Sequence, residues 1–152
     1  LKDQKIQKKY FRKQLEIAAE MDLPIVFHNR EADEDIISIL SDFPGLKGVA
    51  HCFSSTIETA EKLIELGFLI SFSGNLTFKN SKLPEVASKI SLRNLLVETD
   101  SPYLSPTPFR GKPNEPARVR YVAEKLADIH NCSVEKIANR TSENALKLFK
   151  FS

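Results

Sequence analysis

Ionisable and polar side chains follow four short apolar runs of the chain. His28 ends PIVFH, His51 lies in GVAHCF, Ser73 follows FLISF, and Asp100 ends LLVETD. Imidazole nitrogens and carboxylate oxygens are suitable ligands for Zn²⁺ or another divalent cation. His28, His51 and Asp100 are therefore candidate ligands of one metal site. A single histidine after a strand is more commonly a hydrogen-bonded core or loop residue, so at this point both interpretations stay open.

Other residues with reactive or charged side chains give weaker signals. Cys52 follows His51 directly, and strand alternation predicts that it points away from His51 and packs in the interior. His130 is expected at the surface near the end of a helix, where its positive charge would favour the helix dipole. Arg110, with Asn114 in the same proline-rich loop, could clamp a phosphate or pin the loop. Arg30, two residues beyond His28, leaves the same two roles open.

The elements that must position these residues alternate along the chain. Apolar residues at helical spacing predict helices near 11–19, 36–40, 57–64 and 84–90, and two more after a loop at 101–116. Ser133 is expected to cap the last of these, with a further cap at Thr141. The four apolar runs at 24–28, 48–53, 68–74 and 95–100 predict strands between them.

Alternating helices and strands predict an α/β fold with a parallel sheet and helical crossovers. The polar residues at the strand ends lie 23, 22 and 27 positions apart (28 to 51, 51 to 73, 73 to 100), the length of a βα unit. Ligands bind outside the carboxyl ends of the strands in such folds. Glu98 and Asp100 should share one face, because side chains alternate along a strand.

The composition is that of an ordinary globular protein, and we expect one domain over residues 1–152. Lys and Arg number 22 against 20 Asp and Glu, and a net charge of +2 does not by itself indicate nucleic-acid binding. The basic stretch from Lys2 to Lys13 is diluted by Asp3 and three glutamines, which favours a solvated helix face. With no apolar run of membrane-spanning length, no signal-peptide pattern and two distant cysteines, a reduced, cytoplasmic protein without membrane contact is expected.

Several segments resemble those of TatD-type metal-dependent DNases, in the expected order from about Gln4 to Phe149. LPIVFHNREADED, GVAHCFSS, ISFSGNLTFKN and TSENALKLF are each similar to a family segment, with Ser55 where the family usually has glycine. The pair formed by ETDSPYL and RGKPNEP is the most specific. The resemblance implies a TIM-type (β/α) barrel of the amidohydrolase kind.

It also implies hydrolysis of DNA phosphodiester bonds by metal-activated water. His28 and His51 would bind one metal, and Asp100 would bind the other and manage the proton of the water, while Arg30, Arg110 and Asn114 would lie on the substrate side. Mg²⁺ is the first expectation because the substrate is a phosphate ester; Zn²⁺ or Mn²⁺ would equally suit two histidines.

The family pattern is present only in part. Its opening HxH pair and its metal-bridging Glu have no counterpart here, so by the family pattern the chain should correspond to barrel strands five to eight. Because it lacks an initiator Met, we expect a processed or truncated piece. Half a barrel leaves two unpaired strand edges, and we expect a sticky, dimeric or unstable protein. Two other functions therefore stay open: a catalytically silent half-barrel that forms a homodimer or binds an N-terminal partner, and an amidohydrolase-type enzyme with a substrate other than nucleic acid.

Overall fold

The fold is built on four parallel strands in the order β1-β2-β3-β4. The structure, a computed structural model, describes residues 3–150. Each strand pairs with its successor in the sequence. The strands are β1 Ile25–His28, β2 Gly48–His51, β3 Phe68–Phe72 and β4 Leu95–Val97. The predicted parallel α/β fold is thus confirmed, although β4 ends three residues before Asp100.

Helices connect the strands and close the chain. They are α1 Gln4–Glu20, α2 Asp33–Ser41, α3 Ile57–Glu65, α4 Leu83–Lys89, α5 Val119–Ile129 and α6 Val134–Phe149, with short 3₁₀ turns at Gly74–Thr77, Leu92–Asn94 and Pro116–Arg118. Side-chain caps start several of them: Asp3 accepts from Lys5 N, Thr56 from Thr59 N, and Ser133 from Lys136 N. No helix within residues 3–150 combines the length and apolar character needed to cross a membrane.

Thr141 is the one predicted cap that is wrong. α6 continues unbroken through it, and the Thr141 hydroxyl donates to the Ile137 carbonyl at 2.9 Å. Thr141 is only 4% exposed, so its hydroxyl is satisfied inside the helix by the preceding turn. The residues after it therefore extend the helix.

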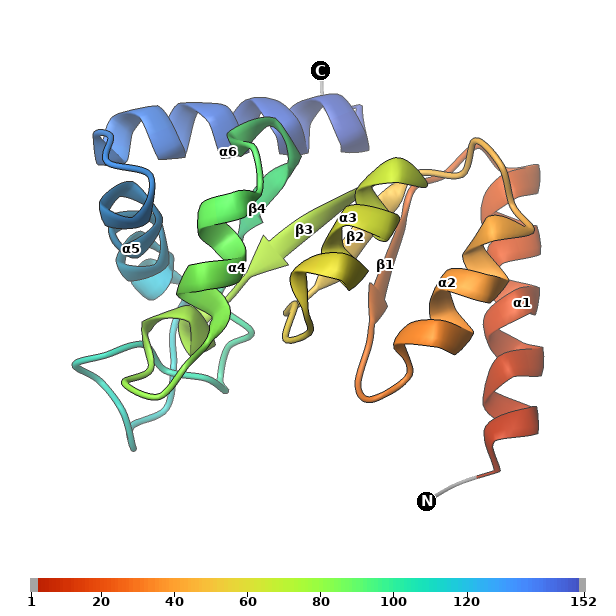
Figure 1. Cartoon of the computed structure of the whole chain (residues 1–152), viewed down its shortest axis with the longest axis horizontal. Coiled ribbons are helices and arrows are strands. Elements are labelled where there is room, and N and C mark those ends of the chain that lie inside the picture. The colour runs from red at the N-terminus through yellow and green to blue at the C-terminus, as the bar shows by residue number, and fades with distance from the viewer. Residues whose placement is uncertain (1–2, 151–152) are drawn as a thin grey trace.

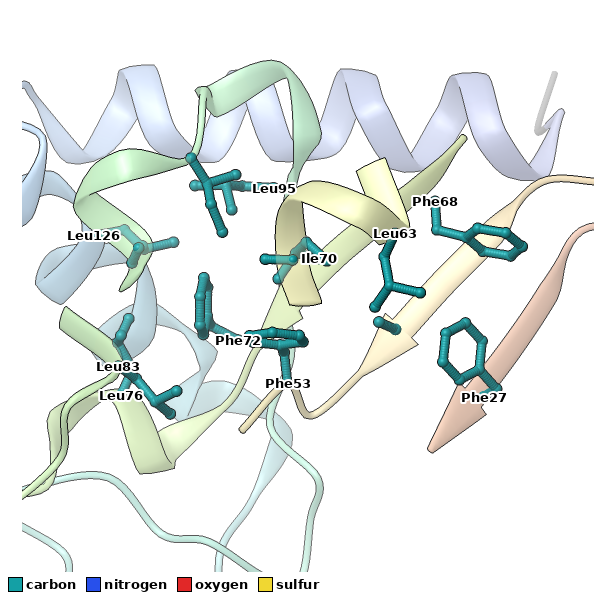
Figure 2. Packing of buried hydrophobic residues seen from close by; sticks show 14 of the residues in the cluster. Phe27, Phe53, Leu63, Phe68, Ile70, Phe72, Leu76, Leu83, Leu95 and Leu126 are labelled. Carbon is teal, nitrogen blue, oxygen red and sulfur yellow. The ribbon is translucent and has the colours of Figure 1, made fainter. Parts of the chain in front are cut away.

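One face of the sheet carries the hydrophobic core. The strand register places Phe27, Ala50, Ile70 and Leu95 in one row across all four strands. This row packs against Leu15, Leu63 and Leu126 from the helices, as part of a single buried cluster. Figure 2 shows the aromatic and aliphatic side chains of this cluster running from β1 to α5. Burial of this face fixes the register, and the alternate residues therefore point to the other face.

The opposite face carries the residues that alternate with the core. Val26 pairs with Val49 and His28 with His51. α6 runs across the sheet on the side of the molecule away from the loops that follow β1 and β4 (Figure 1). A groove of about 310 Å³ separates α6 from this face, with Val49, Ser71 and Phe149 in its wall. Val26 is 57% exposed, so α6 covers this face only in part.

The basic stretch on α1 forms ion pairs with carboxylates. Lys8 lies 2.6 Å from Asp35, and Arg12 lies 2.6 Å from Asp42, both between α1 and the region of α2. Lys13 pairs with Glu16 on α1 itself. All these side chains are substantially exposed, as expected for a solvated helix face.

His130 is more enclosed than the sequence suggested. It caps the end of α5, its Nε2 is buried, and that atom has no hydrogen-bond partner within residues 3–150. Burial lowers the pKa of His130, and a hydrogen bond with the Ala87 backbone opposes this only partly. Burial therefore favours the neutral ring over the charged form that the sequence suggested.

The lowered pKa predicts a loss of stability in acid. The unfolded chain binds a proton at His130 more readily than the folded chain, so the free energy of unfolding should fall as pH drops through about 6.5, the ordinary histidine value. We expect wild-type protein to lose more stability than His130→Gln between pH 7.5 and pH 5, as measured by urea unfolding. Equal losses in the two proteins would contradict this account.

Candidate metal centre

His28 and His51 are the last residues of neighbouring strands. They are paired in the register of β1 and β2, and their ring centroids lie 5.8 Å apart. β2 ends here because the next residue, Cys52, has a left-handed backbone (φ 48°). The two imidazoles are thus brought together by strand pairing, as predicted.

Glu98 and Asp100 approach the same imidazole from beyond β4. The Glu98 amide donates to the Phe72 carbonyl at 3.0 Å and continues the pairing with β3 past the end of β4. Glu98 Oε1 lies 2.8 Å from His51 Nδ1, and Asp100 Oδ1 lies 3.3 Å from His51 Nε2. His51 is therefore flanked by a carboxylate at each ring nitrogen.

Glu98 is the residue at this centre that sequence reasoning left out. Its alternation with Asp100 was the available signal, and the two carboxylates do converge on His51. Alternation alone does not explain it, since the strand ends at Val97 and Asp100 takes a left-handed conformation (φ 57°). Aspartate tolerates that conformation better than most residues. The turn is closed by the Tyr103 amide, which donates to the Asp100 carbonyl at 2.8 Å.

The donor set suits a divalent cation in kind. It offers the imidazoles of His28 and His51 and the carboxylate of Asp100, while Glu98 Oε1, a buried oxygen, lies at the other ring nitrogen of His51. The separation of His51 Nε2 and Asp100 Oδ1 is that of two donors sharing one ion at about 2.1 Å each. Within residues 3–150, no three His, Cys, Asp or Glu side chains lie close enough together to hold a metal ion. The close contacts at this centre are the two that His51 makes with Glu98 and Asp100.

Asn114 holds the loop that carries Asp100. Its side chain donates to the carbonyls of Thr99 and Tyr103, both at 2.8 Å, and accepts from the Glu115 amide at 2.9 Å. The residue is 6% exposed, and both amide protons are used within the chain. The geometry accounts for Asn114 as a residue that positions the loop.

Replacing Asn114 by leucine should destabilise the protein by about 2 kcal/mol, because two carbonyls and one amide lose buried partners. Urea unfolding measures this loss. Asn139→Leu on the exposed side of α6 is the matched control and should cost far less. A loss for Asn114→Leu no larger than that of the control would show that the loop is held by other contacts.

The arginines differ in how they are engaged. The Arg110 guanidinium lies 3.7 Å from the Phe78 ring centroid and donates to the Ser105 carbonyl at 3.4 Å, so it pins the proline-rich loop to the 3₁₀ turn after β3. Arg30 is exposed beside the strand end that carries His28. Of the two roles left open for Arg110, loop attachment is visible in the fold, and substrate contact stays a prediction for both arginines.

A polar network joins the loops after β1 and β2. The Asn29 side chain donates to Asp33 Oδ1, and Ser55 Oγ donates to Asp33 Oδ2 at 2.5 Å. Asp33 thereby links the segment after His28 to the segment after His51. The Ser55 hydroxyl makes a contact in this network that a glycine at this position could not make.

Cys52 is packed in the interior, as predicted, although its thiol still feels the charges of Glu98 and Asp100. It is 5% exposed, and its Sγ contacts Ser73 Oγ at 3.2 Å. Burial raises the pKa of the Cys52 thiol, and the Ser73 contact offsets this in part. Both cysteines are free thiols.

Comparison with known proteins places these features in a family. Residues 2–150 match the family described as TatD related DNase. The chain is 46% identical over 150 residues to the uncharacterized metal-dependent hydrolase YabD of Bacillus subtilis, covering 97% of this chain and 59% of that protein. It is 45% identical over 146 residues to the uncharacterized metal-dependent hydrolase YcfH of Escherichia coli, covering 94% and 55%.

Solved structures agree with the fold. The crystal structure of YJJV, a TatD homolog from Escherichia coli, matches with a TM-score of 0.85 and 32% identity over 91% of this chain and 54% of that one. A TatD family hydrolase from Entamoeba histolytica matches with a TM-score of 0.86 at 22% identity over 97% and 58%, a likeness of fold alone. The chain thus spans somewhat more than half the length of the relatives it matches, as expected for part of a barrel.

Proposed function

The chain belongs to the TatD-related DNase family. We propose that it acts as part of a metal-dependent deoxyribonuclease and that His28, His51 and Asp100 are ligands of its metal site. The observation that carries the proposal is the position of His51, with the His28 ring beside it and Asp100 Oδ1 3.3 Å from its Nε2. Imidazole and carboxylate donors at the carboxyl edge of a parallel sheet are typical of metal-dependent hydrolases.

In this proposal each residue has a separate task. His28 and His51 hold a divalent ion, which supplies positive charge that stabilises charge developing on the phosphate. Asp100 is the catalytic carboxylate: it would bind the same ion as His51, rather than a second ion as the resemblance implied, and would accept the proton of the attacking water. Asn114 keeps the Asp100 loop in place through its two hydrogen bonds.

DNA is the proposed substrate, and Mg²⁺ is the first candidate for the ion, with Mn²⁺ or Zn²⁺ as the others. Arg110 and Arg30 are the proposed phosphate contacts, both exposed in segments that follow the strand ends. A related barrel that hydrolyses another substrate would use the same metal ligands. The metal ligands therefore do not by themselves identify DNA as the substrate.

The experiment is degradation of a labelled single-stranded oligonucleotide by the purified chain. We expect cleavage with Mg²⁺ or Mn²⁺ and none with EDTA. If the chain hydrolysed an ester or an amide but not DNA, the proposed nuclease activity would be wrong and an amidohydrolase-type activity would take its place. No hydrolysis of any substrate by folded protein would overturn the proposal for this chain.

A catalytically silent half-barrel is the second candidate, and two observations favour it. β1 and β4 each have a neighbour on only one side of the described sheet, and no group of three metal-binding side chains is present within residues 3–150. An open strand edge is a template for pairing with a second copy or with a complementary half-barrel. Sedimentation would show a dimer in that case, whereas a well-folded monomer that cleaves DNA would exclude this function.

A further inference from the structure

We propose that Glu98 is a positioning residue, which holds the His51 imidazole in the tautomer whose Nε2 is free to bind a cation. The inference rests on the proposed function only in taking His51 as a metal ligand. Its basis is the placement of a carboxylate at each nitrogen of one ring, at 2.8 Å for Glu98 and 3.3 Å for Asp100.

A neutral imidazole has a single N–H, so it can donate to only one of these carboxylates. If the proton is on Nδ1, it faces Glu98, and Nε2 presents a lone pair beside Asp100. If the proton is on Nε2, it faces Asp100, and the ring cannot bind an ion at that position. The choice between the two carboxylates therefore decides whether His51 can act as a ligand.

Three observations favour the tautomer with the proton toward Glu98. The Glu98 contact is the shorter, and its side chain is 18% exposed against 32% for Asp100, so solvent screens it less. Glu98 Oε1 is also buried without any hydrogen-bond partner in the described part of the chain. His51 Nδ1 lies 2.8 Å from this oxygen, so a proton on Nδ1 is the donor placed to satisfy it.

Glu98 is itself fixed independently of His51. Its amide donates to the Phe72 carbonyl at the end of β3, so the backbone holds the residue in place whatever its side chain does. Removing the carboxylate should therefore change the tautomer of His51 without removing the strand pairing. Partners of metal-binding histidines commonly change metal affinity by about 10- to 100-fold.

The test is a long-range ¹H–¹⁵N correlation spectrum of the histidine rings at alkaline pH, where a free imidazole is neutral. We expect wild-type His51 to carry its proton on Nδ1. Glu98→Ala should shift the proton to Nε2, and Glu98→Gln, which keeps an acceptor oxygen in place, should restore Nδ1. Glu85→Ala, at an exposed glutamate of α4, is the matched control and should leave His51 unchanged.

Mn²⁺ binding measured by calorimetry gives a second readout. Affinity should fall about 10- to 100-fold in Glu98→Ala and recover in part in Glu98→Gln. A wild-type ring protonated on Nε2 would overturn the inference directly, even if Glu98→Ala did not fold. So would an unchanged tautomer in folded Glu98→Ala.

The two proposals fail in different ways. Glu98-dependent tautomerism in a protein that neither binds Mn²⁺ nor cleaves DNA would retain the positioning role and remove the proposed function. If the protein cleaved DNA but the His51 tautomer did not depend on Glu98, the proposed function would stand and the positioning role of Glu98 would be wrong.

Discussion

Asp100→Asn is expected to lower metal-dependent DNA hydrolysis by about a thousandfold or more, the effect of losing roughly 4 kcal/mol of transition-state stabilisation. The carboxylate that lies 3.3 Å from His51 Nε2 becomes a neutral amide of nearly the same shape. It then neither balances the charge of a cation nor accepts a proton from water. The rate of oligonucleotide cleavage at saturating Mg²⁺ or Mn²⁺ measures the effect.

Asp128→Asn is the matched control, because Asp128 is an exposed aspartate on α5 outside the candidate metal centre. It should keep the wild-type rate. The Asp100 variant should also keep its fold, since the backbone bond from the Tyr103 amide and the Asn114 clamp do not use the Asp100 carboxylate. A cleavage rate in Asp100→Asn within tenfold of wild type would mean that the chemistry lies elsewhere.

Gly74→Ala should lower stability strongly for so small a change, with a loss of about 3 kcal/mol. A Cβ at this position would lie 1.8 Å from the Leu104 carbonyl oxygen and 3.0 Å from Pro106 N. Both contacts are with backbone atoms of the proline-rich loop, which cannot rotate away as a side chain could. The loop that follows Asp100 would have to leave the end of β3, so DNA cleavage should fall as well. Thermal unfolding and the cleavage rate measure the two losses.

Gly45→Ala separates this clash from the general cost of replacing glycine. Gly45 has a positive φ of 87°, but a Cβ there would meet nothing within 4 Å. Its loss should be only about 1 kcal/mol, and cleavage should be retained. Equal losses of stability in Gly74→Ala and Gly45→Ala would show that the loop backbone does not lie as close to Gly74 as in this structure.

Much of the fold could be predicted because apolar periodicity and strand-end polarity are local signals. The pairing of His28 with His51 follows from two neighbouring strands of equal length that end in the same kind of residue. The early end of β4 at Val97 and the left-handed Asp100 could not be predicted, because the loop that determines them is fixed by Asn114, fourteen residues further on.

The tertiary contacts of individual side chains were the second feature that could not be predicted from the sequence. Nothing local indicates that Arg110 lies over Phe78, or that Glu98 reaches the Nδ1 of a histidine two strands away. Thr141 shows the opposite error, since a residue typical of a helix start is buried in mid-helix, where its hydroxyl bonds to the preceding turn. In each case tertiary contacts decide a choice that the local sequence leaves open.

Anomalous scattering from a crystal soaked in Mn²⁺ tests the central claim most directly, because it locates the ion without requiring activity. The account predicts a peak in contact with His28, His51 and Asp100, absent from crystals of Asp100→Asn. A peak bound to other residues, or none at this position in protein that cleaves DNA with Mn²⁺, would contradict it.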